Sequence, residues 1–116
     1  MILKLPGGAD AEVPRSKVEA YLLSPSHPVG SAKARYFSSR GYRAESPEVL
    51  ERSLAQLARS GTVRSTQEIE WGTKYLVTGD ITAPDGEKME LATVWMVRDD
   101  APPVLVTAYP WRPQNR

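Results

Sequence analysis

The chain has 116 residues, of which 41% are hydrophobic and 25% are charged, with a formal net charge of +1. These values are typical of one globular domain, and they exclude two complete domains or a disordered chain. Because cysteine is absent, disulfides, thiolate nucleophiles and cysteine-based metal centres are excluded. Neither a signal peptide nor a membrane-spanning run is visible. We therefore predict a single cytoplasmic domain, residues 1–116.

Charge is divided unevenly along the chain. Residues 1–61 hold nine basic and six acidic residues, a net charge of +3, whereas residues 62–116 hold six basic and eight acidic residues, a net charge of −2. One stretch, from residue 27 to residue 43, is basic and contains no acidic residue; its cations are Lys33, Arg35, Arg40 and Arg43. Such a stretch attracts phosphate or another acidic surface. A solvated helix face that keeps the domain soluble explains it equally well.

The first part of the chain, residues 1–61, is predicted to be mainly helical. A short strand is expected at residues 2–5, before the turn Pro6-Gly7-Gly8. Apolar residues at positions 18, 21 and 22 then have helical spacing, and this first helix is expected to end at Pro25.

Two further helices are predicted before residue 62. The second is expected to begin with Ser31 as its cap and to run through Phe37, with Gly41 as its left-handed stop. The third begins at Pro47, where the preceding Ser46 hydroxyl is expected to cap the helix. Its apolar stripe ends at residues 60–61.

From residue 62 onward, β-branched and aromatic residues between short turns predict strands. Four are expected, at residues 62–70, 74–82, 88–97 and 104–109. Asp85-Gly86 is the clearest hairpin signal. The links are too short for parallel crossovers, so we predict an α+β fold with two to three N-terminal helices packed on one face of a four-stranded antiparallel meander. The sheet would occupy residues 62–110, and residues 111–116 would form a frayed tail.

The sheet face that the helices leave open is a candidate ligand surface. Strand alternation gives three sets that can share a face: Thr93 with Trp95, Lys74 with Leu76 and Thr78, and Thr107 with Tyr109. A core position suits Trp95 better than a role as a base-stacking platform. With Tyr75 and Tyr109, however, it would form an aromatic wall suited to unstacked RNA.

Several motifs resemble those of a family of small bacterial proteins of unknown function. They are Leu23-Ser24-Pro25-Ser26-His27-Pro28-Val29-Gly30-Ser31-Ala32-Lys33-Ala34-Arg35-Tyr36-Phe37, Gly72-Thr73-Lys74-Tyr75, Thr93-Val94-Trp95 and Val106-Thr107-Ala108-Tyr109-Pro110. In element order and in its fourth strand, that family is similar to the barnase, EndoU, colicin and RelE-like ribonuclease toxins of toxin–antitoxin and polymorphic-toxin systems. The resemblance implies metal-independent RNA cleavage and a small antitoxin or immunity protein as partner.

Cleavage of RNA by its own 2′-hydroxyl requires a base, an acid and a cation at the phosphorane. We assign these roles by side-chain chemistry. His27 is the candidate base, since histidine suits proton transfer near neutrality, although a Ser-His-Pro turn in which the imidazole binds a carbonyl is an equal alternative. Lys33 and Arg35 are candidate phosphate ligands. They point about 160–200° apart on a helix, so only one faces a given ligand, and we favour Lys33.

The remaining site predictions are hydrogen-bonding and RNA-binding residues. Thr107 and Tyr109 are candidate hydrogen-bond donors in catalysis. Five side chains are predicted to bind RNA: Arg40, Arg43, Lys74, Tyr75 and Trp95. Lys74 has an alternative role in protecting a sheet edge. No metal or cofactor is expected.

Three functions compete at this point. The first is a toxin-like, metal-independent endoribonuclease. The second is a non-catalytic module that binds a protein or nucleic acid, such as the inhibitor component of a toxin pair. The third is a metal-dependent hydrolase, which would need carboxylates gathered around His27, namely Asp80, Glu90, Asp99 or Asp100. Carboxylates of the sheet half would repel RNA if they faced the site; these are Glu68, Glu70, Asp80, Glu87 and Glu90.

Overall fold

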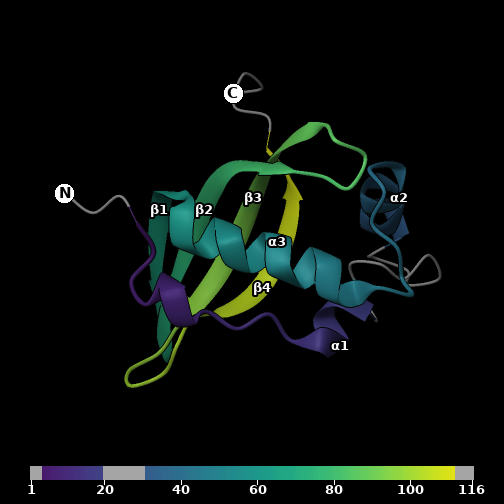
Figure 1. Cartoon of the computed structure of the whole chain (residues 1–116). Coiled ribbons are helices and arrows are strands. Elements are labelled where there is room, and N and C mark those ends of the chain that lie inside the picture. The colour runs from purple at the N-terminus through teal and green to yellow at the C-terminus, as the bar shows by residue number, and fades with distance from the viewer. Residues whose placement is uncertain (1–3, 20–30, 112–116) are drawn as a thin grey trace.

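The computed structural model describes residues 4–19 and 31–111, and it has the predicted α+β fold (Figure 1). The helical elements are η1 (Gly8–Asp10), α1 (Arg15–Lys17), α2 (Ser31–Ser39) and α3 (Pro47–Ser60). The strands are β1 (Thr62–Ile69), β2 (Gly72–Thr82), β3 (Lys88–Val97) and β4 (Val104–Pro110). They form one antiparallel sheet in the order β1-β2-β3-β4, so the predicted meander is confirmed. In the described part of the chain, no helix is both long and apolar enough to span a bilayer.

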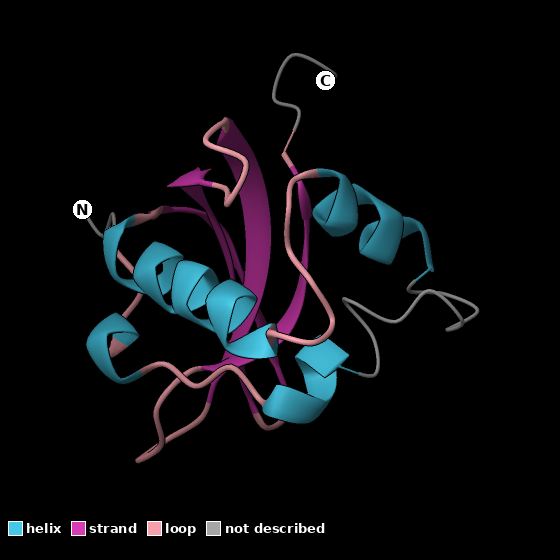
Figure 2. Cartoon of the chain, turned by 45° about the vertical axis from the view of Figure 1, so that its right-hand side comes forward, coloured by secondary structure: helices cyan, strands magenta, loops and turns pink. Residues whose placement is uncertain are grey.

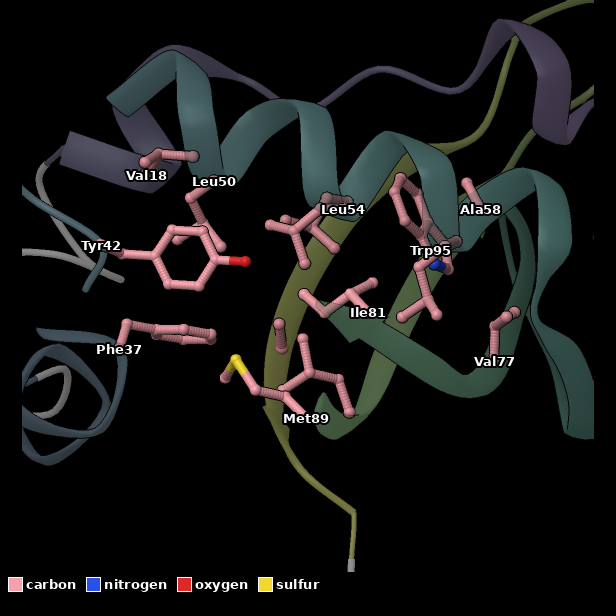
Figure 3. Close-up of a cluster of buried hydrophobic side chains, with 14 of the residues drawn as sticks. Val18, Phe37, Tyr42, Leu50, Leu54, Ala58, Val77, Ile81, Met89 and Trp95 are labelled. Carbon is pink, nitrogen blue, oxygen red and sulfur yellow. The ribbon is translucent and has the colours of Figure 1, made fainter. Parts of the chain in front are cut away.

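Helix α3 crosses one face of the sheet and forms the centre of the core (Figures 1 and 3). The stripe of leucines on this helix has no exposed surface; it consists of Leu50, Leu54 and Leu57. Trp95 is also fully buried, and its Nε1–H donates to Thr93 Oγ1 at 2.7 Å. The Thr93 hydroxyl in turn donates to the Val77 carbonyl at 2.9 Å, which satisfies the polar atoms of this buried cluster. The core position favoured for Trp95 is therefore confirmed, and the expectation that it binds RNA is wrong, because the indole has no surface on which a base can stack.

Helix α2 lies beside the sheet, next to the edge strand β4, instead of over the face that α3 covers (Figures 1 and 2). Its C-terminus is closed by a Schellman motif, in which Gly41 N–H donates to the Ser38 carbonyl and Tyr42 N–H donates to the Phe37 carbonyl. Gly41 has a φ of 99°, so the predicted left-handed stop is confirmed. The rings of Phe37 and Tyr42 meet edge to face, with centroids 5.9 Å apart (Figure 3).

The hairpin between β2 and β3 holds this end of α2. Asp85 N–H donates to the Arg40 carbonyl at 3.1 Å, and the Asp85 carboxylate lies 3.9 Å from Arg40 Nη1. A Cβ atom at position 41 would lie 3.0 Å from Pro84 Cβ, which is too close. The contact between this end of α2 and the hairpin therefore requires a glycine. Helix α2 is therefore fixed relative to the sheet at its C-terminal end.

Some local predictions for the N-terminal part are wrong. Lys4 and Leu5, the described residues of the expected first strand, are not in a strand. The segment instead pairs through Glu12, whose N–H donates to the Pro103 carbonyl and whose carbonyl accepts from Leu105 N–H. The Ser46 hydroxyl does not cap α3. Its carbonyl accepts the Val49 N–H, so the backbone itself closes the first turn.

The first helix is confirmed only at its beginning. Helix α1 starts directly after Pro14, and the buried Val18 follows it. The rest of the expected helix lies outside the described residues.

The buried hydroxyl of Tyr42 provides a pH test of how α2 is attached to α3. The hydroxyl lies 2.9 Å from Ser53 Oγ, and burial raises the pKa of Tyr42 above its usual value of about 10. The folded state therefore keeps the Tyr42 proton at a pH where the unfolded chain loses it. The protonated hydroxyl stabilises the fold fully below about pH 10, and this contribution is lost as the pH rises through the raised pKa of the folded state. Tyr42→Phe should cost about 1 kcal/mol at pH 7.

The difference in unfolding free energy between wild type and Tyr42→Phe should then shrink when urea denaturation is repeated above pH 10. Tyr75→Phe is the matched control, because no hydrogen bond of its hydroxyl is present among the described residues. A difference that stays constant as pH is raised would contradict the assignment.

Candidate functional site

The face of the sheet opposite α3 carries the candidate site. Strand register arranges its side chains in rows. In one row, Tyr109 of β4 pairs with Ala92 of β3, and Ala92 pairs with Thr78 of β2. The next row contains Thr107, Val94 and Leu76, and the row on the other side contains Glu90 and Asp80.

A β-bulge adds a cation to this face. The register of β1 against β2 shifts between Val63 and Ser65, so Arg64 has no cross-strand partner. Its Nε–H donates to Thr78 Oγ1 at 2.8 Å, which places the guanidinium on the open face. The guanidinium carbon lies 5.9 Å from the centroid of the Trp111 ring, a cation–π contact.

A second cation–π contact lies at the β4 edge of the sheet. Lys33 of α2 places its Nζ 5.6 Å from the centroid of the Tyr109 ring. Arg64 instead reaches from β1 over Thr78 of β2 to the ring of Trp111, which follows β4. The open face therefore presents two cations, each beside an aromatic ring.

Trp111 separates two hollows at the end of this face. Its N–H donates to the Glu90 carbonyl at 2.9 Å, so the prediction that the frayed tail begins at residue 111 is wrong. The hollow of about 270 Å³ is lined by Thr62, Arg64, Thr78, Gly79, Asp80, Glu90 and Trp111. The hollow of about 350 Å³ is lined by Tyr36, Arg40, Lys88, Met89, Glu90, Pro110 and Trp111.

The structure brings together three of the five predicted catalytic residues. Lys33 is half-buried against Tyr109, and Thr107 lies in the neighbouring row of the same face. Arg35 is exposed, as expected for a residue on the other side of α2 from Lys33. The fifth residue, His27, lies outside the described residues.

The predicted RNA-binding residues are dispersed. Arg40 lines the larger hollow, whereas Arg43 is exposed and lies 4.0 Å from Glu45. Lys74 is on the open face but four residues along β2 from Thr78, about 13 Å away. Tyr75 packs against the core on the face that α3 covers. The expected aromatic wall of Tyr75, Trp95 and Tyr109 is therefore not formed.

Two buried polar atoms of this region are unsatisfied. Thr107 Oγ1 and Trp111 Nε1 have no hydrogen-bond partner within the described part of the chain. A buried polar atom without a partner costs about 1–3 kcal/mol. A bound water or ligand would satisfy atoms of this kind.

The carboxylates proposed for a metal are not gathered. Asp80 and Glu90 face each other across β2 and β3, whereas Asp99 and Asp100 follow the opposite end of β3. Within residues 4–19 and 31–111, no three acidic or imidazole side chains are close enough to share a metal ion.

Sequence reasoning missed two residues of the site. Arg64 reaches the open face because of a β-bulge. The alternation of polar and apolar residues in β1 does not predict where such a bulge inserts its extra residue. Trp111 follows Pro110 at the end of the chain, where polar and proline residues predict a tail. The signal that was available is the aromatic residue itself, since tryptophan seldom stays in solvent.

Comparison with known proteins gives a family match and a similar solved fold. A family model described as "Domain of unknown function (DUF6883)" matches residues 4–112. A chain of a contact-dependent growth inhibition toxin–immunity protein complex from Klebsiella pneumoniae 342 has a similar fold, with a TM-score of 0.70 and 16% sequence identity. The match covers 91% of this chain and 97% of that chain. No curated protein matches the sequence.

Two threonines of the open face provide a matched test of its hydrogen bonding. Thr107→Val removes a buried hydroxyl without a partner, so the free energy of unfolding should stay unchanged or rise by up to about 1 kcal/mol. Thr78→Val removes the acceptor of Arg64 and should lower it by about 1 kcal/mol. Urea denaturation monitored by circular dichroism measures both. Equal losses in the two variants would show that Thr107 is hydrogen-bonded in solution.

Proposed function

We propose that this chain, which belongs to the DUF6883 family, is a toxin-like endoribonuclease that cleaves RNA without a metal ion. The observation that carries the proposal is the pair of cation–π contacts, Lys33 with Tyr109 and Arg64 with Trp111, on the helix-free face of the sheet. Cations bind the phosphate backbone, and aromatic rings stack unpaired bases. The fold shared with a chain of a toxin–immunity complex supports a role in a toxin system, as either component.

The reaction needs no co-reactant. The 2′-oxygen of a ribose attacks the adjacent phosphorus, the bond from phosphorus to the 5′-oxygen breaks, and a 2′,3′-cyclic phosphate remains. A base takes the 2′-hydroxyl proton, and an acid gives a proton to the departing 5′-oxygen. A fixed cation stabilises the charge on the phosphorane.

We assign the cationic role to Lys33, because it is positioned against Tyr109 at the edge of the open face. The Tyr109 hydroxyl lies on the same face as a candidate hydrogen-bond donor to the phosphate, whereas the Thr107 hydroxyl is buried and has no surface at which to donate to one. Arg35 would bind RNA only outside this site, since it is exposed on another side of α2. His27 is retained from the sequence as the proposed base.

A protein-binding role is the second candidate, and the other end of the sheet supports it. Trp71 is 60% exposed at the β1–β2 turn, and it shares a hollow with three acidic residues, Glu68, Glu70 and Asp99. An exposed tryptophan is a common anchor of protein interfaces. In a toxin this surface would receive an immunity protein or antitoxin; in an inhibitor it would be the functional surface itself.

Expression under tight induction in a bacterium separates the two functions. The wild type should stop growth and fragment total RNA in the cytoplasm. Lys33→Ala should lower RNA cleavage on the order of 100-fold, because it removes the proposed phosphorane cation, and His27→Ala should do the same if it is the base. Arg59→Ala, which removes an exposed cation of α3 on the covered side of the sheet, is the matched control and should remain toxic.

Growth and intact RNA with soluble, folded wild type would contradict the proposal and favour the binding module. Toxicity that Lys33→Ala leaves unchanged would contradict the assigned site.

A further inference from the structure

We propose that the outer edge of strand β1, residues 65–69, binds an extended basic segment of a partner protein as an added strand of the sheet. The inference goes beyond RNA cleavage and does not depend on it. It gives the surface around Trp71 a binding mode and its partner a defined chemistry. The strand concerned is the outermost one in the order β1-β2-β3-β4 (Figure 1).

The two edges of the sheet differ in how they are covered. At the β4 edge, the backbone of Glu12 bonds to Pro103 and Leu105, and α2 lies beside the strand (Figures 1 and 2). At the β1 edge, the strand pairs with β2 on one side, and no hydrogen bond from the described residues reaches its other side. Alternate N–H and C=O groups of an edge strand point away from its neighbour, so β1 offers an unpaired row of them.

Strand β1 lacks most of the features that block an edge. Proteins commonly protect an edge strand with proline, lysine, a bulge or a covering segment. β1 contains neither proline nor lysine, and its bulge lies between Val63 and Ser65, before the proposed segment. From Ser65 to Ile69 the register with β2 is regular, and four of these five residues are exposed. A regular segment of this length is sufficient for pairing with another strand.

The side chains of β1 select the composition of the added strand. Successive residues of a strand point to opposite faces of the sheet, so Glu68 and Ile69 lie on different faces of this edge. A cation opposite Glu68 and an apolar side chain opposite Ile69 form favourable cross-strand pairs. An added strand in which basic and apolar residues alternate therefore fits both faces, while its backbone bonds to the edge.

Trp71 extends this surface beyond the end of β1. It is 60% exposed in the β1–β2 turn, beside a hollow of about 400 Å³ whose lining includes Glu68, Glu70 and Asp99. None of these three carboxylates has an ion-pair or hydrogen-bond partner among the described residues. An exposed tryptophan is a common anchor of protein interfaces, and unpaired carboxylates around it attract a basic partner.

The same charges disfavour two other occupants of the edge. The carboxylates repel the phosphates of RNA. A second copy of this chain would bring the same carboxylates to the edge. Its one cation in β1, Arg64, is already bonded to Thr78 and placed over the Trp111 ring on the open face. A basic protein segment is therefore the occupant that the charges favour.

An octapeptide in which lysine and valine alternate is the probe, and the octapeptide with glutamate in place of lysine is its control. In a ¹H–¹⁵N spectrum of the full chain, the basic peptide should shift the amides of residues 65–69 and the indole of Trp71 in a saturable manner. The indoles of Trp95 and Trp111 should stay in place. At a concentration about ten times its Kd, the peptide should slow hydrogen exchange of the outward β1 amides about tenfold, because the added strand bonds to them.

Substitutions separate strand addition from general attraction of a basic peptide. Trp71→Ala and Glu68→Gln should each weaken binding of the basic peptide about tenfold, since one removes the anchor and the other a charged pair. Glu90→Gln, which removes an acidic residue of β3 on the open face, is the matched control and should leave binding unchanged. All three side chains are exposed, so each variant should keep the melting temperature of wild type.

Three results would overturn the proposal: no saturable shift with the basic peptide, equal binding of the basic and acidic peptides, or binding without slower exchange of the β1 amides. A dimer of the chain that protects the same amides in the absence of peptide would assign the edge to a second copy and overturn it as well. These samples contain no RNA, so failure of strand addition leaves the proposed cleavage intact, and failure of cleavage leaves strand addition intact.

Discussion

The contact between α2 and the edge of the sheet is the constraint on which the candidate site depends. Phe37 and Tyr42 close the helix with a Schellman motif, and the backbone bond from Asp85 to Arg40 fastens that end to the β2–β3 hairpin. This attachment places Lys33, in the first turn of α2, over the ring of Tyr109. If α2 had packed on the face that α3 covers, its basic residues would lie on the wrong side of the sheet from Tyr109 and Thr107.

The two faces of the sheet carry different kinds of side chain. The face under α3 is filled with apolar side chains, and the buried polar cluster around Thr93 and Trp95 is satisfied internally. The open face carries charged and hydroxyl groups and two unsatisfied polar atoms. Charge also changes along the strands, from the cations near α2 to the acidic surface around Trp71. Under the proposed function, one small domain would present an RNA surface at one end and a protein surface at the other.

Much of the fold was predictable because its signals are local. The strand boundaries follow from β-branched residues and short turns, and Gly41 marks the end of α2 through a conformation that favours glycine. The site was less predictable because it depends on tertiary register. Alternation places Thr107 and Tyr109 on one face, but it does not reveal that Tyr75 and Trp95 face the core. The bulge at Arg64 and the hydrogen bond that retains Trp111 arise only after the strands pair.

Cleavage of a defined RNA by purified protein tests the central claim most directly. The substrate is a short oligoribonucleotide that contains all four bases, compared with the DNA oligomer of the same sequence, which has 2′-deoxy groups throughout, in buffer containing EDTA. We expect wild type to cut the first and to leave a 2′,3′-cyclic phosphate, detected by mass spectrometry, and to leave the second intact. The Lys33→Ala variant should cut neither. Cleavage of the 2′-deoxy oligomer, or no cleavage of either by folded wild type, would contradict the account.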